Sequence, residues 1–462
     1  MTTTESKPVT IACRCGERFH VDERSVGRRL KCRCGRVITV RRPRRRRRNR
    51  IGAAARRLKS LGTAVVRAIP RRSRDASDAR RRPSSRRHLS RVERIATRTL
   101  TLLIWGYLAS VCSIAIVMWT LGDRWWMATV LLFSGRWIFL VPLALLLPAA
   151  MLLNRRLVWV PILAGLVVAG PIMGAHVGWR TLLPTPKGLP FRVVSFNAAG
   201  GDRLAVDLPI VLAGWEADVV ALQECGPTLA EAVRVVVGWH HHSANGICFL
   251  SRYPIRDSSV MDRSALETVR SSTARIGGYG AVVRYLIETP SGVVQVTNLH
   301  LETPRKGLEG LTDFDIDRLR ENTRLRDIES DLARRWVDRG IANGPPPVAM
   351  LVAGDFNTPV ESRIFQAHWS DGFDDAFSRV GRGLGMTKYA GWIRVRIDHV
   401  LTGPQWSVRR TAVGDDLGSD HRPLIVDLVL PARSSAVRDS TPTSRVEPAG
   451  ASVLPGHPEL LK

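Results

Sequence analysis

One stretch of the sequence joins an apolar, strand-like run to a cluster of polar residues: VAMLVAGDFNTP, at residues 348–359. The run 348–353 has the short, continuously apolar pattern of a strand that is buried on both faces. Asp355 and Asn357 follow it on a tight turn, and Gly354 permits a backbone conformation that other residues avoid. A buried strand that ends on two reactive side chains predicts a functional site at a sheet edge.

Other strand-like runs also end on polar residues. The runs lie at 191–196, 219–222, 247–250, 281–287, 293–299, 397–401 and 424–430. The polar residues at or near their ends are Asn197, Gln223 and Glu224, Asn298 with His300, Asp398, and the trio Ser419, Asp420 and His421. Each of them alone would be an ordinary turn residue. Their joint occurrence predicts that they share one site.

The motifs in this region, taken in chain order, resemble the endonuclease/exonuclease/phosphatase superfamily over about residues 191–430. They are VVSFN, DVVALQE, ICFLSRYPI, NLHLE, VAGDFNTP, RIDHVL and GSDHRPL. The resemblance implies an α+β fold, a four-layer αββα sandwich of two stacked β-sheets flanked by helices. It also implies hydrolysis of phosphate esters with Mg²⁺ or Mn²⁺. The residue types agree, because this chemistry needs oxygen ligands for a hard cation, a base for water and donors for the phosphoryl charge.

The resemblance also implies roles for individual residues. Glu224 is expected to be the main metal ligand, with Asn197 as its carbonyl partner and Asp420 assisting the metal or the water. Asp355 is expected to orient or deprotonate the attacking water, while Asn357 donates to a phosphoryl oxygen.

Two histidines and two basic residues complete the predicted site. His300 is placed by the family match to stabilise the phosphoryl group. His421 would contact the phosphate or transfer a proton, and Asp398 would fix its tautomer. Arg305 and Lys306 could grip a second phosphate of a diphosphate substrate, although a solvated pair of loop charges explains them equally well.

Two features make nucleic acid a less favoured substrate. Family members that act on abasic DNA usually carry an acidic residue two places after the first Asn, and here that position is Ala199. Residues 181–462 hold 32 basic and 33 acidic residues, although the whole chain has a formal charge of +28. Proteins that bind duplexes commonly present a basic face to the phosphates.

Upstream of this domain, residues 99–180 are apolar and rich in tryptophan, as in membrane-interface belts. The uncharged run 99–121 would be about 34 Å long as a helix, which matches the thickness of a bilayer. The runs 137–153 and 157–176 predict a helical hairpin, and the stretch 125–136 is expected to lie at the membrane interface. We therefore expect three transmembrane helices.

The basic residues predict how these helices are oriented. Residues 1–98 contain 32 Lys and Arg against 7 acidic residues, and Arg155 with Arg156 lie in the second short loop. Under the positive-inside rule both segments are cytoplasmic, so the catalytic domain is extracytoplasmic in the cell membrane. The Arg-rich segment 41–98 is expected to be a disordered linker that faces anionic lipid, with RNA as a less favoured partner.

A small zinc-ribbon-like head is predicted at residues 1–40. Its two Cys-x-Cys-Gly knuckles offer four thiolates that suit tetrahedral Zn²⁺: Cys13, Cys15, Cys32 and Cys34. The inner spacing is shorter than the usual Cys-x₂-Cys, so a tail without metal remains the alternative. A partner of this head cannot be named from the sequence.

Together these features predict six segments: the head, the linker, the helices at 99–180, a tether at 181–190, the domain at 191–430 and a disordered tail at 431–462. An anchored, outward-facing domain of this superfamily resembles the VanJ type of glycopeptide-resistance membrane protein, which implies a lipid phosphatase of the polyprenyl diphosphate type. The alternatives are a membrane-anchored nuclease or phosphodiesterase, and a tethered binding protein that uses the head and linker.

Cys225 and Cys248 are either paired in a disulfide or present as two buried thiols.

Overall fold

The computed structural model describes residues 9–12, 18–21, 29–31, 33–34, 37–39, 90–184, 186–266, 280–340 and 346–431. The chain divides into two compact units, Met1–Arg87 and His88–Lys462. In the first unit, antiparallel pairs join β1 (Val9–Ala12) to β2 (Arg18–Val21) and β3 (Arg29–Lys31) to β4 (Val37–Thr39).

Most of the predicted zinc head lies outside the described residues, and so do residues 41–89 of the predicted linker and 432–462 of the predicted tail. Of the four expected ligands, Cys34 is described and is exposed, whereas Cys13, Cys15 and Cys32 are not described. Zinc binding by this segment therefore stays a prediction.

Two six-stranded sheets form the centre of the second unit. Their strand orders are β10-β11-β12-β13-β18-β14 and β19-β20-β6-β7-β9-β8. The strands of the first sheet are β10 (Ile255–Val260), β11 (Ala281–Thr289), β12 (Gly292–His300), β13 (Ala349–Asp355), β14 (Asp374–Asp375) and β18 (Asp398–Thr402). Those of the second are β6 (Gly188–Gly200), β7 (Val219–Cys225), β8 (His240–Ala244), β9 (Ile247–Ser251), β19 (Ser407–Val413) and β20 (Leu424–Pro431).

The two sheets pack face to face because successive side chains of a strand point to opposite faces. Val193 of β6 belongs to the apolar cluster between the sheets, whereas its neighbour Val194 belongs to the cluster on the outer face. In the inner cluster, the rings of Phe249 in β9 and Tyr285 in β11 stack with their centroids 3.9 Å apart.

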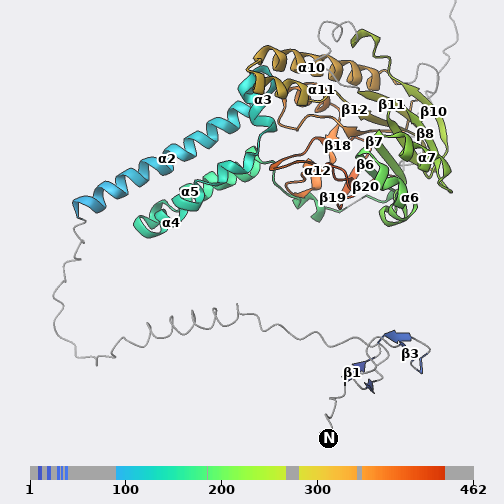
Figure 1. Cartoon of the computed structure of the whole chain (residues 1–462), viewed down its shortest axis with the longest axis horizontal. Helices are drawn as coiled ribbons and strands as arrows, with labels where there is room; N and C mark the ends of the chain where they lie inside the picture. Colours follow the sequence, from blue (N-terminus) through green and yellow to red (C-terminus); the bar gives the residue numbers. More distant parts are fainter. Residues whose placement is uncertain are drawn as a thin grey trace, which may run out of the picture. The chain divides into compact units, whose positions relative to one another are not determined.

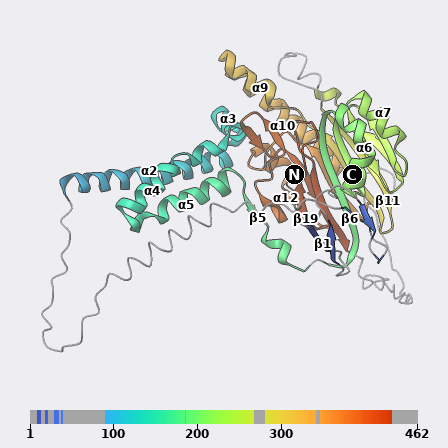
Figure 2. The same ribbon diagram turned by 60° about the horizontal axis from the view of Figure 1, so that its bottom comes forward.

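Helices cover both outer faces of the sandwich. The helices α6 (Asp202–Trp215) and α7 (Pro227–Val235) share an apolar cluster with β6, β7 and β9 (Figure 2). The helices α10 (Ile316–Asp338) and α11 (Arg363–Trp369) share another with β12, β13 and β18 (Figure 1). Two mixed sheets flanked by helices confirm the predicted sandwich.

Strand register brings the polar strand ends together. The strands β12 and β13 are parallel, and their last residues, His300 and Asp355, are directly paired. On its other side Asp355 is paired with Asp398, the first residue of antiparallel β18. In the second sheet, parallel pairing of β6 with β7 sets Asn197 beside Gln223.

Among the described residues, three helical segments are long and apolar enough to cross a membrane: Arg91–Thr120, Arg136–Leu153 and Arg155–Ile172. Their number agrees with the prediction. The first, α2 (Arg91–Thr120), begins before the predicted residue 99 because Ser90 and Glu93 form a capping box at its start. The second contains η3 (Arg136–Leu140) and α4 (Leu143–Leu153), and the third contains η4 (Arg155–Leu157), α5 (Trp159–Val167) and η5 (Val168–Ile172).

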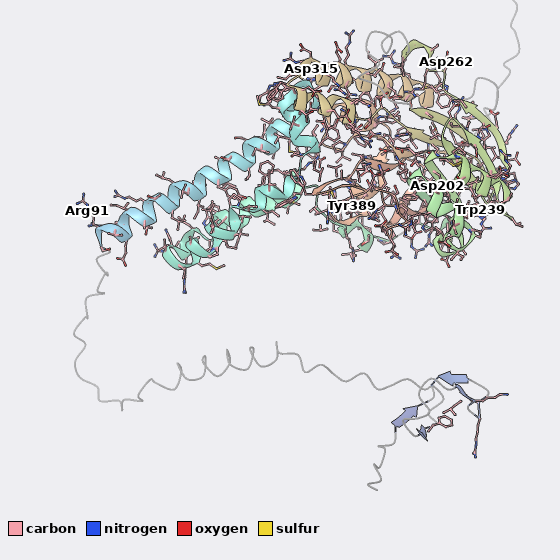
Figure 3. The ribbon with its side chains drawn as sticks, viewed as in Figure 1. Arg91, Asp202, Trp239, Asp262, Asp315 and Tyr389 are labelled. Carbon is pink, nitrogen blue, oxygen red and sulfur yellow. A yellow bond between two sulfur atoms is a disulfide. The ribbon has the colours of Figure 1, made fainter. Side chains whose placement is uncertain are left out.

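Two contacts align α2 with the third segment, and α2 and α5 lie side by side in Figure 1. The ring of Trp105, in the middle of α2, meets that of Trp159, at the start of α5, edge to face with centroids 5.6 Å apart. Near the end of α2, Trp119 Nε1 donates to the carbonyl of Pro171 at 2.9 Å. Arg91 lies at the end of α2 that is remote from the sheets (Figure 3).

The helices are joined to the domain through buried ion pairs. After α2 come η2 (Gly122–Arg124) and α3 (Trp126–Phe133), and α3 packs against α10. Buried Asp123 of η2 lies 3.5 Å from Nη1 of buried Arg326 in α10, and Arg136 Nη1 lies 3.2 Å from Glu361 Oε1. The stretch expected at the membrane interface thus forms a contact with the domain that the sequence analysis did not foresee.

Candidate active site

Asp355 lies at the centre of the polar strand ends and is 1% exposed. The preceding Gly354 lies inside β13, with φ +150°, and a Cβ atom there would overlap the carbonyl oxygen of Leu299 in β12. The glycine is therefore required by the close approach of the neighbouring strand, not by the turn that the sequence analysis assigned to it. In the turn itself, Asn357 has φ +51°.

The side-chain amide of Asn197 contacts two carboxylates that come from different sheets. Asn197 Nδ2 donates to Glu224 Oε1 at 2.9 Å and to Asp355 Oδ2 at 3.0 Å. His300 Nε2 lies 3.6 Å from the first of these oxygens and 3.9 Å from the second. Four of the predicted site residues thus surround one point between the sheets.

His421 lies on the other side of Asp355, between two aspartates. Its Nδ1 is 2.8 Å from Asp398 Oδ2, and its Nε2 is 3.6 Å from Asp355 Oδ2. Burial alone would lower the pKa of His421, but the charges of Asp398 and Asp355 raise it to about 9. The imidazole is therefore cationic at neutral pH.

The two aspartates respond differently to this environment. Burial, and then the charge of Asp398, raises the pKa of Asp355 above its ordinary value, although His421 and His300 oppose the shift. Burial also pushes the pKa of Asp398 upward, but His421 and the Thr387 hydrogen bond outweigh it and hold that pKa below the ordinary value. Asp398 is thus the fixed anion of the pair, and Asp355 is the stronger base.

Asn357 and Asp420 line different parts of the site. The backbone N–H of Asn357 donates to Asp355 Oδ1 at 2.8 Å, and its Nδ2 donates to the carbonyl of Leu301 at 2.8 Å. An amide carries two N–H groups, so one remains for a ligand. Asp420 is paired with Lys388 and lies 3.8 Å from His421 Nε2. Its neutralised carboxylate is a poorer candidate for a metal ligand than Glu224.

The donor set fits a divalent cation. Glu224 and Asp355 supply carboxylate oxygens at one point, which is the chemistry that hard cations prefer. Asp355, Asp398 and His421 form a second, buried group whose ligand atoms lie within 4.8 Å of one another. Because the Asp398–His421 hydrogen bond already uses Nδ1, we favour the Glu224 side of Asp355 as the cation site.

These side chains line a cavity of about 490 Å³. Glu224, His300, Asp355, Asn357 and His421 lie along one part of it. Arg305 is also in its wall. Lys306 is not among the lining residues, and its Nζ lies 3.9 Å from Glu309 Oε2. Of the two predicted phosphate ligands, the structure therefore brings only Arg305 to the site.

Residues 194–421 match the sequence pattern of the Endonuclease/Exonuclease/phosphatase family. This segment is a domain of that family. Members of the family are metal-dependent hydrolases that act on phosphoester bonds. No curated protein matches the chain.

Several solved structures resemble this family domain. An endonuclease/exonuclease/phosphatase from Beutenbergia cavernae is 15% identical, with a TM-score of 0.38, and the match covers 52% of this chain and 72% of the other. A humanized D. rerio TDP2 is 17% identical, with a TM-score of 0.40, covering 52% and 98% of the two chains. A truncated Caenorhabditis elegans TDP2 is 19% identical, with a TM-score of 0.38, covering 53% and 98%.

The family domain contains one cation at the site that sequence reasoning missed. Lys388 of β16 (Lys388–Ala390) lines the cavity, pairs with Asp420 and forms a β-bridge with His421. No strand-end pattern marks this lysine, because β16 is a three-residue strand in a short hairpin with β17 (Ile393–Val395). Only the tertiary structure brings it to the site.

Beneath the site, the family domain is cross-linked in two ways. Gln223 Nε2 donates to Asn298 Oδ1 at 2.6 Å, which joins the two sheets. Directly after Glu224, Cys225 forms a disulfide with Cys248 of neighbouring β9, with Cα atoms 5.8 Å apart. The structure thus selects the paired alternative for these cysteines, and both links hold the strand that carries Glu224.

Proposed function

We propose that this chain is a membrane-anchored, metal-dependent phosphoesterase that hydrolyses a lipid phosphate or diphosphate of the polyprenyl type. The observation that carries the proposal is the attachment of the candidate site to three apolar helices. Buried ion pairs from Asp123 and Arg136 join the two parts, so the site is held beside the segments that would lie in the bilayer.

Each site residue has a role that its geometry supports. Asp355, with its raised pKa, accepts the proton of the attacking water. Cationic His421, oriented by Asp398, donates from Nε2 to a phosphoryl oxygen or to the leaving group. His300 and the remaining N–H of Asn357 donate to other phosphoryl oxygens.

A divalent cation held by Glu224 beside Asn197 would stabilise the negative charge that develops on the phosphoryl group. Mg²⁺ and Mn²⁺ are the ions we propose, because both accept carboxylate oxygens. The amide oxygen of Asn197 accepts from the N–H of Ala199, so Glu224 is the ligand that supports this proposal. Arg305 and Lys388 would hold a second phosphate, since both line the same cavity. The pairing of Asp420 with Lys388 makes Asp420 a positioning residue for this lysine.

We propose that the domain is extracytoplasmic. Arg91 begins α2, and Arg155 with Arg156 follows α4, so these basic residues lie at the helix ends away from the domain, whereas Arg136 at the domain end is paired with Glu361. The Cys225–Cys248 disulfide supports the same orientation, because such bonds persist in oxidising compartments.

For the N-terminal head we keep the proposal of one Zn²⁺ bound by Cys13, Cys15, Cys32 and Cys34. Measuring zinc per chain by atomic emission, before and after replacement of Cys32 and Cys34 by Ser, tests it. Loss of zinc in the variant supports the site, and a wild-type chain without zinc contradicts it. If the head binds a partner and not zinc, the wild-type chain should capture that partner, and the same variant should abolish the capture.

The test of the enzyme uses the full chain in detergent with Mg²⁺. We expect phosphate release from polyprenyl diphosphate, lost in His421→Ala and retained in the control His240→Ala, because His240 is exposed on the edge strand β8. The same preparations are assayed with single-stranded and duplex DNA and with phosphodiester lipids. Cleavage of DNA without phosphate release would replace the lipid phosphatase by the nuclease, and no hydrolysis at all would favour a tethered binding protein.

A further inference from the structure

We infer, on the basis of the proposed function, that the apolar half of the catalytic cavity binds the hydrocarbon chain of the substrate, and that the helical anchor supplies part of its wall. The lining of the cavity combines two chemical classes. Residues of the candidate site line it together with an apolar set, which consists of Phe133, Leu308, Ile393, Val395 and Ile397.

The apolar side comes from three separate parts of the chain. Phe133 ends α3, which directly follows the first candidate span. Leu308 lies in α9 (Arg305–Glu309), and Ile393 and Val395 lie in β17, whose hairpin partner β16 contains Tyr389 (Figure 3). The anchor and the family domain therefore build this wall together.

The apolar wall belongs to the same core as the candidate spans. Phe133, Val395 and Ile397 belong to one buried cluster with residues of α2, α5 and η5, and Leu308 and Ile393 pack against it. That cluster includes Met118 and Ile172, at the ends of two spans. One apolar core therefore links the cavity lining to the helices that would lie in the bilayer.

The lining also offers a cation for an anionic headgroup. Among the described residues, the guanidinium of Arg305 has no ion-pair partner, and Arg305 lines the cavity with Leu308 of the same helix α9. The guanidinium suits a phosphate oxygen and the apolar set suits hydrocarbon, while Glu302 and Glu309 add carboxylates to the lining. A ligand with one anionic and one apolar end matches both halves.

A nucleic acid matches the wall less well. Stacking of a base requires an accessible aromatic face, and Phe133 is the aromatic residue in the cavity wall. The guanidinium carbon of Arg326 already lies 5.1 Å from the centroid of its ring, and Phe133 is 7% exposed. The remaining side chains of the apolar wall are aliphatic.

The test compares substrates that share a diphosphate headgroup and differ in chain length, a long polyprenyl diphosphate and the short dimethylallyl diphosphate. Leu308→Gln and Ile393→Asn introduce a polar group at partly exposed wall positions, and Val206→Gln is the control on the exposed surface of α6. We expect the ratio of kcat/KM for the long to the short substrate to fall about tenfold or more in both wall variants. The control should keep the wild-type ratio.

A variant that still hydrolyses the short substrate has a folded active site, so loss of folding is recognised directly. An unchanged ratio, with wild-type rates on the long substrate, would overturn the inference, and so would equal losses on both substrates. A second variant, Ile393→Trp, narrows the apolar side and should shift the preference toward shorter chains.

A binding measurement that needs no turnover separates failure of the proposed function from failure of this inference. Alkyl methylenediphosphonates with an ethyl or a dodecyl chain are titrated into the wild-type protein in detergent by calorimetry. Tighter binding of the dodecyl compound, weakened about tenfold in Leu308→Gln, supports the apolar site even if no phosphate is released. Equal binding of both compounds overturns the inference whatever the enzyme hydrolyses.

Discussion

His421 owes its protonated state mainly to Asp398, whose carboxylate accepts from Nδ1 inside the protein. In Asp398→Asn this charge is lost, so the pKa of His421 falls from about 9 toward the ordinary value. If cationic His421 is needed for the chemical step, the alkaline limb of the kcat profile moves to lower pH. We also expect kcat to fall roughly 100-fold, measured as phosphate release from pH 5 to 10.

The matched control is Asp374→Asn, which removes an exposed carboxylate that pairs with Arg379. Its pH profile should match the wild type. An Asp398→Asn enzyme with an unshifted alkaline limb would show that His421 is not the titrating group.

Glu224 is the residue whose loss should affect the metal most directly. Glu224→Gln keeps the shape of the side chain and removes one charged ligand, so the Mg²⁺ concentration that gives half-maximal activity should rise about tenfold or more. Binding of Mn²⁺ followed by electron paramagnetic resonance provides a readout without catalysis. Glu216→Gln, whose side chain is 77% exposed, is the control, and equal Mn²⁺ affinity of both variants would contradict the assignment.

At the scale of elements, one buried arginine connects the segment that follows α2 to the turn of the candidate site. Arg326 of α10 lies 3.5 Å from Asp123 in η2 and donates from Nη2 to the carbonyl of Asn357 at 3.0 Å. Asp123→Ala leaves this cation buried without its carboxylate, which costs about 3–5 kcal/mol of unfolding free energy. We also expect a lower kcat, because the turn that carries Asn357 loses its support.

Thermal unfolding in detergent, together with the kinetic assay, measures both effects. The control is Asp317→Ala, which removes an exposed ion pair with Arg320 and should change the stability by less than about 1 kcal/mol. Wild-type stability of Asp123→Ala would show that the anchor and the domain are energetically independent.

The disulfide acts on two other elements, β7 and β9. Its half-cystines are separated by 23 positions, so replacing Cys225 and Cys248 by Ser should lower the unfolding free energy by about 3 kcal/mol. Cys112→Ser, a change in α2 away from the disulfide, is the control. Reaction of two more thiols in the wild-type chain than in the double variant, with an alkylating reagent under denaturing and non-reducing conditions, would show that the bond does not form.

At the scale of the whole molecule, the orientation of the helices decides which substrates the site can meet. A periplasm-active phosphatase reporter fused after residue 462 should be active, and a fluorescent reporter that needs the cytoplasm should fluoresce only at the N-terminus. The opposite pattern at both ends would place the domain in the cytoplasm and restore nucleic acid as a substrate. A reporter placed within the predicted tether should be fused after residue 187 at the latest, because β6 begins at Gly188.

Local sequence patterns predicted much of this structure. Alternating and continuous apolar runs predicted the strands, long uncharged runs predicted the number of candidate spans, and polar residues at strand ends predicted Asn197, Glu224, His300, Asp355, Asp398 and His421 as neighbours. These inferences succeed because side-chain period and run length depend on a few consecutive residues. Strand register then brings the ends of parallel strands to the same edge without further information.

Contacts between distant segments were decided only by the tertiary structure. Arg326 and Asp123 are 203 positions apart, Phe133 approaches the catalytic residues from the anchor, and Lys388 reaches His421 from a three-residue strand. No local periodicity encodes such neighbours, because they arise from how whole helices and sheets pack. The sequence by itself therefore determined the sandwich and the polar residues of the candidate site. Packing decided that apolar side chains from α3 and β17 line the same cavity.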